Sequence, residues 1–275
     1  MIAHHRIIDA IGVMIVLVGA LCVGGAIGFQ LQPWAAAMGH EAARQDGAAV
    51  PHVLSDVSLR QSVQSLHHQR RYTPDAAIAP VANGRVPVIG RVDTHQPVVF
   101  LTIDDGNYKG PSVVAAMKRY QLKASLFLAD LFIWHDPKFF EALTKTGSLV
   151  ENHTDHHELK MLERGYEYQR SEICGMASIV TSYYGRRPTL FRPPGGRYDD
   201  ATLRAAADCG MRALVMWTAR VQSGAIEYQD GRTALRPGDI VLMHFHADFA
   251  QDIEAFMKAK RDAKLTVELL EDWVR

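Results

Sequence analysis

Two adjacent aspartates close a run of apolar residues. Asp104 and Asp105 follow the stretch 98–103, where a charged group costs free energy unless it is paired or used in chemistry. Successive side chains of a strand point in opposite directions, so the two carboxylates can serve different tasks. A plainer interpretation is that Asp105 and Gly106 only make a turn.

Two histidines four residues apart form a second candidate group. His153 and His157 could face the same metal ion if the segment between them forms a helical turn. This spacing alone is a weak signal, because it also arises by chance in a chain with 13 histidines. Two further polar groups come later: Arg192 opens a rigid Pro-Pro-Gly turn, and His244 lies near the end of an apolar run.

The segments around these groups alternate between strand and helix patterns. Strands are expected at 98–103, 124–129, 148–150, 189–191, 213–217 and 240–245. Helices are expected after Pro111, from Asp136, over 166–183, from Asp199 to Gly210 and near 249–257. Repeating β-α units indicate parallel strands, in either a barrel or an open sheet. In both folds the active site lies at the carboxyl ends of the strands, which is where the four polar groups stand.

From about residue 98 to its end, the chain resembles the polysaccharide deacetylases of carbohydrate esterase family four, also called the NodB-homology domain. Residues 102–106 look like the Asp-Asp motif of that family, with isoleucine in place of the more usual phenylalanine. Residues 153–157 match its His-(Ser/Thr)-x-x-His motif completely. Residues 192–195 are similar to its Arg-Pro-Pro-Tyr motif, and residues 242–244 to its Leu-x-His motif. The resemblance implies a distorted (β/α) barrel.

The resemblance also implies metal-dependent hydrolysis of an N-acetyl group on a sugar. Asp105, His153 and His157 would bind one divalent ion, with zinc the first choice and cobalt or another divalent ion as alternatives. Such an ion polarises the acetyl carbonyl and lowers the pKa of bound water toward ~7. The expected substrate is an N-acetylglucosamine-type glycan of the cell wall, such as peptidoglycan, or an extracellular polysaccharide.

The same resemblance assigns roles to the remaining site residues. Asp104 would be the general base, and Arg192 would keep it ionised and oriented. His244 would be the general acid that protonates the leaving amine. The backbone N–H of Gly195 would bind the oxyanion. The pocket for the acetyl methyl would be walled by two side chains, Leu242 and Trp217.

The chain departs from the family pattern at two places. Gly195 stands where the family has an aromatic residue, and residues 217–221 lack the acid that often supports the catalytic histidine. Glu227 and Asp230 are candidate replacements for that acid by proximity in sequence alone. Two other histidines are expected to be bystanders near the site, His156 and His246.

The N-terminus carries an apolar segment of 19 residues, 11–29, with no charge. As a helix it would span ~28 Å, close to the ~30 Å hydrocarbon core of a bilayer. We expect residues 1–30 to be a transmembrane anchor, with a signal peptide cleaved near 35–37 as the alternative. Either one exports the rest of the chain.

Residues 31–97 are expected to be a stalk, with a short amphipathic helix near 53–70 followed by an irregular linker. The deacetylase domain is expected to span residues 98–275.

Composition narrows the class of protein. The 275 residues carry 30 basic and 30 acidic side chains, which argues against a nucleic-acid partner and leaves the glycan and the membrane as the expected partners.

The chain has three cysteines, of which Cys22 lies in the apolar leader. Cys174 and Cys209 fall in separate expected helices and are interpreted as core residues.

Two other functions compete with the deacetylase. One is a pseudoenzyme that binds metal and glycan without turnover, suggested by the missing acid. The other is a hydrolase of a different C–N bond, because one fold hosts several chemistries. The Asp104, Arg192 and His244 set favours the enzyme, since a pure binding protein has no use for a base with its own arginine.

Overall fold

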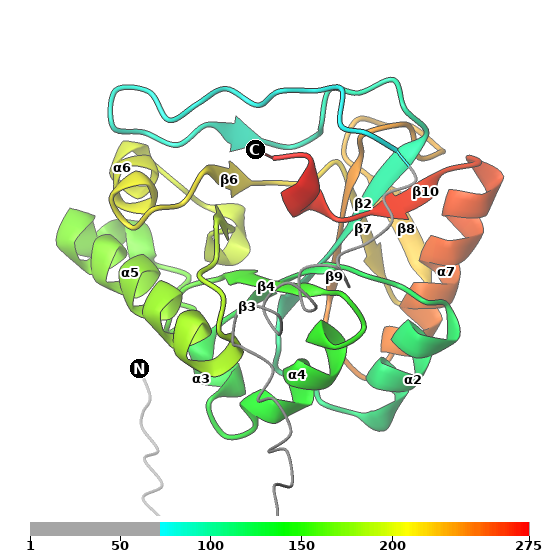
Figure 1. The fold of residues 1–275 in the computed structure, drawn as a ribbon, viewed down its shortest axis with the longest axis horizontal. Coiled ribbons are helices and arrows are strands. Elements are labelled where there is room, and N and C mark those ends of the chain that lie inside the picture. Colours follow the sequence, from blue (N-terminus) through cyan, green and yellow to red (C-terminus); the bar gives the residue numbers. More distant parts are fainter. Residues whose placement is uncertain (1–71, 275) are drawn as a thin grey trace, which may run out of the picture. The chain divides into compact units, whose positions relative to one another are not determined.

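The computed structural model describes residues 72–274, which form ten strands and six α-helices (Figure 1). The strands are β1 (Val88–Ile89), β2 (Val98–Asp105), β3 (Ser125–Leu128), β4 (Leu149–Asn152), β5 (Leu190–Phe191), β6 (Ala213–Val215), β7 (Ala219–Gln222), β8 (Ala225–Tyr228), β9 (Ile240–His244) and β10 (Thr266–Glu268). The α-helices are α2 (Pro111–Arg119), α3 (Asp130–Ile133), α4 (Pro137–Thr144), α5 (Gly165–Tyr184), α6 (Asp200–Asp208) and α7 (Phe249–Asp262). Three short 3₁₀ helices are Met161–Arg164, Pro194–Gly196 and Leu270–Asp272.

The strands build one curled sheet in the order β1-β6-β5-β4-β3-β2-β9-β7-β8, with β10 paired to the first part of β2. Every pair is parallel except the β7–β8 hairpin. The predicted α/β class with a parallel sheet is therefore confirmed. β1 and β8 end the order without pairing to each other, so the described part of the chain is a half-barrel, consistent with a distorted (β/α) barrel.

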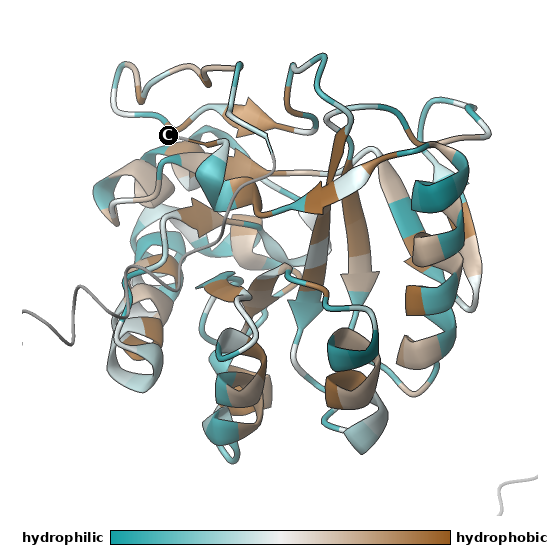
Figure 2. Ribbon diagram, turned by 45° about the vertical axis from the view of Figure 1, so that its right-hand side comes forward, coloured by the Kyte–Doolittle hydropathy of each residue, from teal (hydrophilic) through white to brown (hydrophobic). Residues whose placement is uncertain are grey.

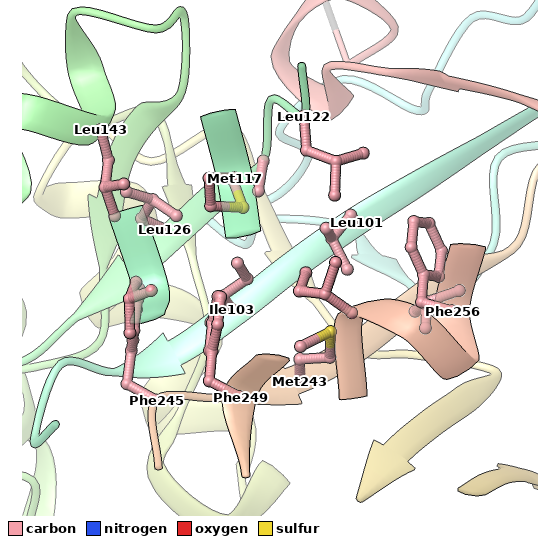
Figure 3. Close-up of a cluster of buried hydrophobic side chains, with 14 of the residues drawn as sticks. Leu101, Ile103, Met117, Leu122, Leu126, Leu143, Met243, Phe245, Phe249 and Phe256 are labelled. Atoms are coloured by element: carbon pink, nitrogen blue, oxygen red, sulfur yellow. The ribbon is translucent and has the colours of Figure 1, made fainter. Parts of the chain in front are cut away.

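Strand β2 runs through the centre of the sheet and is covered on both faces. Leu101 and Ile103 face a core that α2, α4 and α7 close from outside (Figure 3). Phe100 belongs to a second core on the inner face of the curl. Figure 2 shows the central strands as mainly hydrophobic, as expected for parallel strands between two layers. Thr102 and Asp104 alternate with these apolar side chains and bring polar groups to the inner face.

Local signals set the helix boundaries that the sequence predicts. Pro111 opens α2, and Asp136 caps α4 by accepting from the backbone N–H of Phe139 at 3.3 Å. Asp199 starts α6 with a capping box. Gly185 ends α5 in the left-handed conformation. These helices pack on the outer face of the sheet and hold the strand ends in place.

The structure differs from the sequence prediction at residues 72–97, the later part of the expected stalk at 31–97. β1 pairs with β6, and three apolar side chains of this segment are buried: Val86, Ile89 and Val92. The folded unit therefore begins before residue 98. A two-residue strand between prolines is too short to show a hydrophobic period, which is why the sequence pattern did not reveal it.

A disulfide joins Cys174 of α5 to Cys209 at the end of α6, with the Cα atoms 4.9 Å apart. The interpretation of these cysteines as free core residues was therefore wrong. The error arose because separate helices in the sequence were treated as separate in space, whereas α5 and α6 share one apolar cluster.

No helix between residues 72 and 274 is both long and apolar enough to cross a bilayer. The anchor expected at 11–29 and the amphipathic helix expected near 53–70 lie outside the described residues.

Candidate metal-dependent active site

A cavity of about 230 Å³ lies at the carboxyl ends of the central strands. All of the metal, acid–base and wall residues predicted from the sequence line it except Arg192, which lies behind Asp104. The lining residues are Asp104, Asp105, His153, His157, Leu159, Gly195, Gly196, Trp217, Leu242 and His244. The four polar groups therefore lie together at one edge of a parallel sheet, as expected.

Asp105, His153 and His157 offer three ligand atoms that lie within 4.8 Å of one another. Asp105 Oδ1 is 3.3 Å from His153 Nε2 and 3.2 Å from His157 Nε2. Ligands at ~2.0–2.2 Å from one tetrahedral ion are separated by about these distances. Among the described residues this is the one group of three or more His, Cys, Asp or Glu side chains that could hold a metal.

The histidine pair does not lie on a helical turn. Residues 153–157 form an irregular loop after β4, in which Thr154 and His157 have positive φ angles of 70° and 51°. Thr154 Oγ1 accepts from the backbone N–H of His157 at 3.1 Å, and Asn152 Oδ1 accepts from that of Thr154 at 3.0 Å. These short-range hydrogen bonds, rather than a helix period, bring the two imidazoles together.

The ring of His153 is oriented by a backbone group. Its Nδ1 lies 2.7 Å from the carbonyl oxygen of Arg192, so a proton on Nδ1 leaves Nε2 with a free lone pair toward Asp105. Burial raises the pKa of Asp105, but hydrogen bonds with His153 and His157 outweigh it and hold the pKa well below its usual range. The carboxylate is therefore ionised, as a metal ligand must be.

Asp105 and Gly106 also make the turn that the plainer interpretation expects. Their φ angles are 79° and 92°, so the strand alternation breaks at Asp105 and both aspartates reach the same cavity. A Cβ on Gly106 would lie 2.7 Å from Ile133 Cγ2, which excludes any larger residue. The expectation that the two carboxylates point to opposite sides of the strand was therefore wrong.

Asp104 is buried and bound to a buried arginine. Arg192 donates from its NH1 group to Asp104 Oδ1 at 2.6 Å and to Thr102 Oγ1 at 2.9 Å. Its remaining donors reach the carbonyl oxygens of Val215 and Met216 at 3.0 and 3.3 Å. Asp104 Oδ2 lies 3.8 Å from His153 Nε2, beside the ligand group and outside it. The carboxylate is thus held by one oxygen, while the other faces the cavity side.

His244 lies directly across from Asp104 in the β2–β9 register. No acidic side chain in residues 72–274 hydrogen-bonds to its ring. The two candidate supporters are bound elsewhere, since Glu227 pairs with Arg220 and Asp230 with Arg232. Neither of the two candidates offered by sequence proximity is therefore a hydrogen-bond partner of His244.

The two extra histidines lie apart from the cavity lining. His156 Nδ1 is 2.8 Å from Glu172 Oε1, and His246 Nε2 is 2.7 Å from the fully buried Asp252. Both rings hold neighbouring loops to helices, consistent with the bystander interpretation.

Two lining residues escaped the sequence analysis, Leu159 and Gly196. Gly196 has φ 68°, and a Cβ there would lie 2.8 Å from Trp217 Cη2, so glycine lets the indole approach the turn. The Gly-Gly pair after Pro-Pro carries this signal. Leu159 is 54% exposed and carries no signal beyond its closeness to His157 in sequence.

Comparison with known proteins agrees with this site. A family model described as polysaccharide deacetylase matches residues 91–214. An uncharacterized protein of Streptomyces coelicolor is 40% identical over 194 residues, which cover 68% of this chain and 77% of that protein. The peptidoglycan-N-acetylglucosamine deacetylase of Bacillus cereus is 26% identical over 64% of this chain and 86% of its own length.

Solved structures show the same fold. A family 4 carbohydrate esterase from Bacillus anthracis aligns with a TM-score of 0.58 at 20% identity, over 67% of this chain and 86% of that one. A carbohydrate esterase family 4 pseudoenzyme from Bacillus anthracis aligns with a TM-score of 0.59 at 20% identity, over 72% and 70% of the two chains. On these matches the chain belongs to the polysaccharide deacetylase family, whose deacetylase relatives are hydrolases of N-acetyl groups.

Proposed function

We propose that this protein is a metal-dependent hydrolase that removes N-acetyl groups from an N-acetylglucosamine-type glycan of the cell wall. One observation carries the proposal: the Asp105, His153 and His157 group lies beside a separate carboxylate, Asp104, that has its own arginine. The similarity to the peptidoglycan-N-acetylglucosamine deacetylase of Bacillus cereus supports peptidoglycan as the substrate.

The three ligand residues suit a catalytic metal ion. Two imidazoles and one carboxylate leave coordination positions open, and they accept zinc, cobalt and several other divalent ions. When bound, such an ion acts as a Lewis acid on the acetyl carbonyl and lowers the pKa of coordinated water toward ~7. The carbonyl oxygen of Arg192 orients the His153 ring for metal binding. Asp105 is ionised, as a carboxylate ligand must be.

Asp104 takes the proton from the attacking water in this proposal. Its Oδ1 accepts a charge-assisted hydrogen bond from Arg192, and its Oδ2 remains to accept the proton. Because Arg192 is fully buried and donates to four acceptors, it fixes the position of Asp104.

His244 completes the acid–base pair by protonating the leaving amine. It sits opposite Asp104 on the neighbouring strand and lines the same cavity. The backbone N–H of Gly195 donates to the developing oxyanion, and Trp217 and Leu242 enclose the acetyl methyl group. With these roles every predicted site residue has one task.

We also propose that the domain works outside the cytoplasm, tethered by residues 1–30 or released after cleavage. The apolar segment 11–29 supports export. The Cys174–Cys209 disulfide gives independent support, because disulfides persist in oxidising compartments and are rare in the cytosol.

A binding protein without turnover is the second candidate function. Two observations favour it: no acidic side chain in residues 72–274 hydrogen-bonds to the His244 ring, and the fold resembles that of a carbohydrate esterase family 4 pseudoenzyme. The intact pair of Asp104 and Arg192 argues for catalysis. Hydrolysis of another C–N bond is a third candidate, which a substrate panel separates from the first.

Acetate release tests the proposed function. The purified protein is incubated with N-acetylglucosamine oligomers, chitin and peptidoglycan, each with and without a chelator. We expect acetate from at least one glycan and none after chelation. Glycan binding without acetate would support the pseudoenzyme instead, and acetate release that withstands metal removal would contradict the metal-dependent reaction.

A further inference from the structure

The three proposed metal ligands come from two loops that are far apart in the sequence. Asp105 ends β2 and enters the turn at Gly106, whereas His153 and His157 belong to the loop after β4. A metal site needs its ligands held to within about 0.5 Å of the productive geometry. A structural connection between the two loops therefore bears directly on metal binding.

The short helix α3 lies against the histidine loop. The backbone N–H of Leu131 donates to the carbonyl oxygen of Asp155 at 2.9 Å. The ring of Phe132 packs against the imidazole of His157, with the ring centroids 5.2 Å apart and the planes inclined by 56°. Helix α3 therefore holds the loop through its backbone and the His157 ring through a side chain.

The same helix contacts the turn that follows Asp105. Ile133 packs over Gly106, where a Cβ would lie 2.7 Å from its Cγ2 atom. Just before α3, the backbone N–H of Ala129 donates to the carbonyl oxygen of Asp105 at 3.2 Å. The segment around α3 thus touches both ligand loops.

Lys109 joins the turn to α3 with one ammonium group. Its Nζ donates to the carbonyl oxygen of Phe132 at 2.6 Å and to that of Gly106 at 3.1 Å. The Phe132 carbonyl belongs to the last turn of α3, where carbonyl groups lack partners within the helix. The ammonium also lies over the ring of Phe140, 5.7 Å from its centroid. Because both acceptors are backbone atoms, Lys109 fixes main-chain positions on either side of the site.

We propose that Lys109 is a positioning residue for the metal site, which keeps Asp105 and His157 at the spacing that one ion requires. One of its hydrogen bonds holds Gly106, the residue next to Asp105. The other holds Phe132, whose ring contacts His157. The inference rests on the proposed metal-dependent function and deepens it. Lys109 acts through these neighbours, because it is not among the described residues that line the catalytic cavity.

Cobalt affinity tests this role without requiring turnover. The full-length protein is stripped of metal with a chelator and titrated with Co²⁺, whose visible absorption reports both the affinity and the ligand geometry. Lys109→Met removes the donors and keeps an apolar stem beside Phe140. Lys109→Arg supplies a cation with donors and is the rescue variant. The matched control is Lys145→Met, at an exposed lysine that pairs with Glu141.

We expect the cobalt affinity of Lys109→Met to fall by about 10–100-fold, as is typical when a group that orients metal ligands is removed. The visible spectrum of the bound cobalt is expected to change as well. Lys109→Arg is expected to recover most of the affinity, and Lys145→Met to match wild type. A lysine with a purely structural role would lower the melting temperature of the metal-free protein and leave the affinity and the spectrum unchanged.

Lys109→Gln, with a shorter side chain and a neutral donor, gives the same comparison with a smaller loss if Lys109→Met does not fold. Wild-type affinity and spectrum in folded Lys109→Met or Lys109→Gln would overturn the proposal. A loss in Lys109→Arg as large as that in Lys109→Met, or no cobalt binding by wild type, would overturn it too.

Acetate release by the wild-type protein separates the two proposals. Acetate release together with a cobalt affinity that does not depend on Lys109 rejects the positioning role alone. A cobalt affinity that depends on Lys109, in a protein that releases no acetate, rejects catalysis and leaves the positioning role standing.

Discussion

The two aspartates after β2 are adjacent in sequence but differ in their surroundings. Asp105 contacts the two imidazoles, whereas Asp104 contacts the guanidinium of Arg192 and has one oxygen left. The sequence motifs predict both aspartates as site residues, because each charged group ends an apolar strand. The motifs could not show that a positive φ angle at Asp105 turns both carboxylates to one side.

Asp104→Asn tests the division of tasks between the aspartates. The amide keeps the shape and can still accept from Arg192, but it cannot take a proton. We expect acetate release to fall by about 10²–10⁴-fold while metal content stays the same, because Asp104 is outside the ligand group.

The measurements are initial rates of acetate release and metal content per chain. Asp93→Asn, at a side chain that is 97% exposed, is the matched control and is expected to behave as wild type. Wild-type rates in the Asp104→Asn protein would remove the proposed base.

At the scale of elements, the long β-α units were predictable and the short pieces were not. β2, β3 and β9 are continuous apolar runs, and α4 and α6 begin at capping residues. The β7–β8 hairpin was missed although Ser223 and Gly224 give its two-residue turn, both at positive φ. β10 has three residues and is defined only by its pairing with β2, which no local pattern can show.

The C-terminal 3₁₀ helix is joined to the sheet through a buried pair of acids. Glu271 Oε2 accepts from Ser125 Oγ at 2.9 Å. The second acid, Glu151, pairs with Arg186. Burial raises the pKa of both Glu151 and Glu271. Glu271 Oε1 has no hydrogen-bond partner among the described residues. The two carboxyl groups therefore favour a state that keeps a proton.

This pair predicts a pH-dependent stability. The pKa of Glu271 in the folded protein is above the 4.5 of an exposed glutamate, so the folded chain keeps a proton that the unfolded chain has lost. The contribution of Glu271 to the free energy of unfolding is fully present below pH 4.5. It declines as the pH rises through the pKa of Glu271 in the folded protein. We expect the free energy of unfolding of Glu271→Gln to fall less than that of wild type as the pH rises above 4.5.

Thermal unfolding at a series of pH values measures this effect. Glu163→Gln, on an exposed side chain, serves as the control and is expected to follow the wild-type profile. Parallel pH profiles for wild type and Glu271→Gln would show that the buried pair holds no such proton.

At the scale of the whole molecule, the Cys174–Cys209 disulfide supports the fold, and disulfides persist in oxidising compartments. Cys174 and Cys209 are 35 residues apart, and the loop they close contains Arg192 and Gly195. The bridge therefore joins α5 to α6 around the segment that holds Asp104. Sequence spacing alone could not predict this pairing, because it depends on how the two helices pack.

Replacing both cysteines with serine is expected to lower the free energy of unfolding by about 3–4 kcal/mol, because closure of a loop of this length restricts the unfolded chain. Denaturant unfolding with and without a thiol reductant checks the estimate. Wild type should weaken in reductant, and the double variant should not respond to it. Equal midpoints for all four samples would contradict a formed disulfide.

Metal titration followed by acetate release tests the central claim most directly. Protein stripped with a chelator is titrated with zinc or cobalt, and bound metal and acetate release are measured in the same samples. We predict that activity returns in proportion to metal and saturates at one ion per chain, and that Asp105→Ala neither binds the ion nor regains activity. Full acetate release by the metal-free protein, or metal binding and activity in Asp105→Ala equal to wild type, would contradict the account.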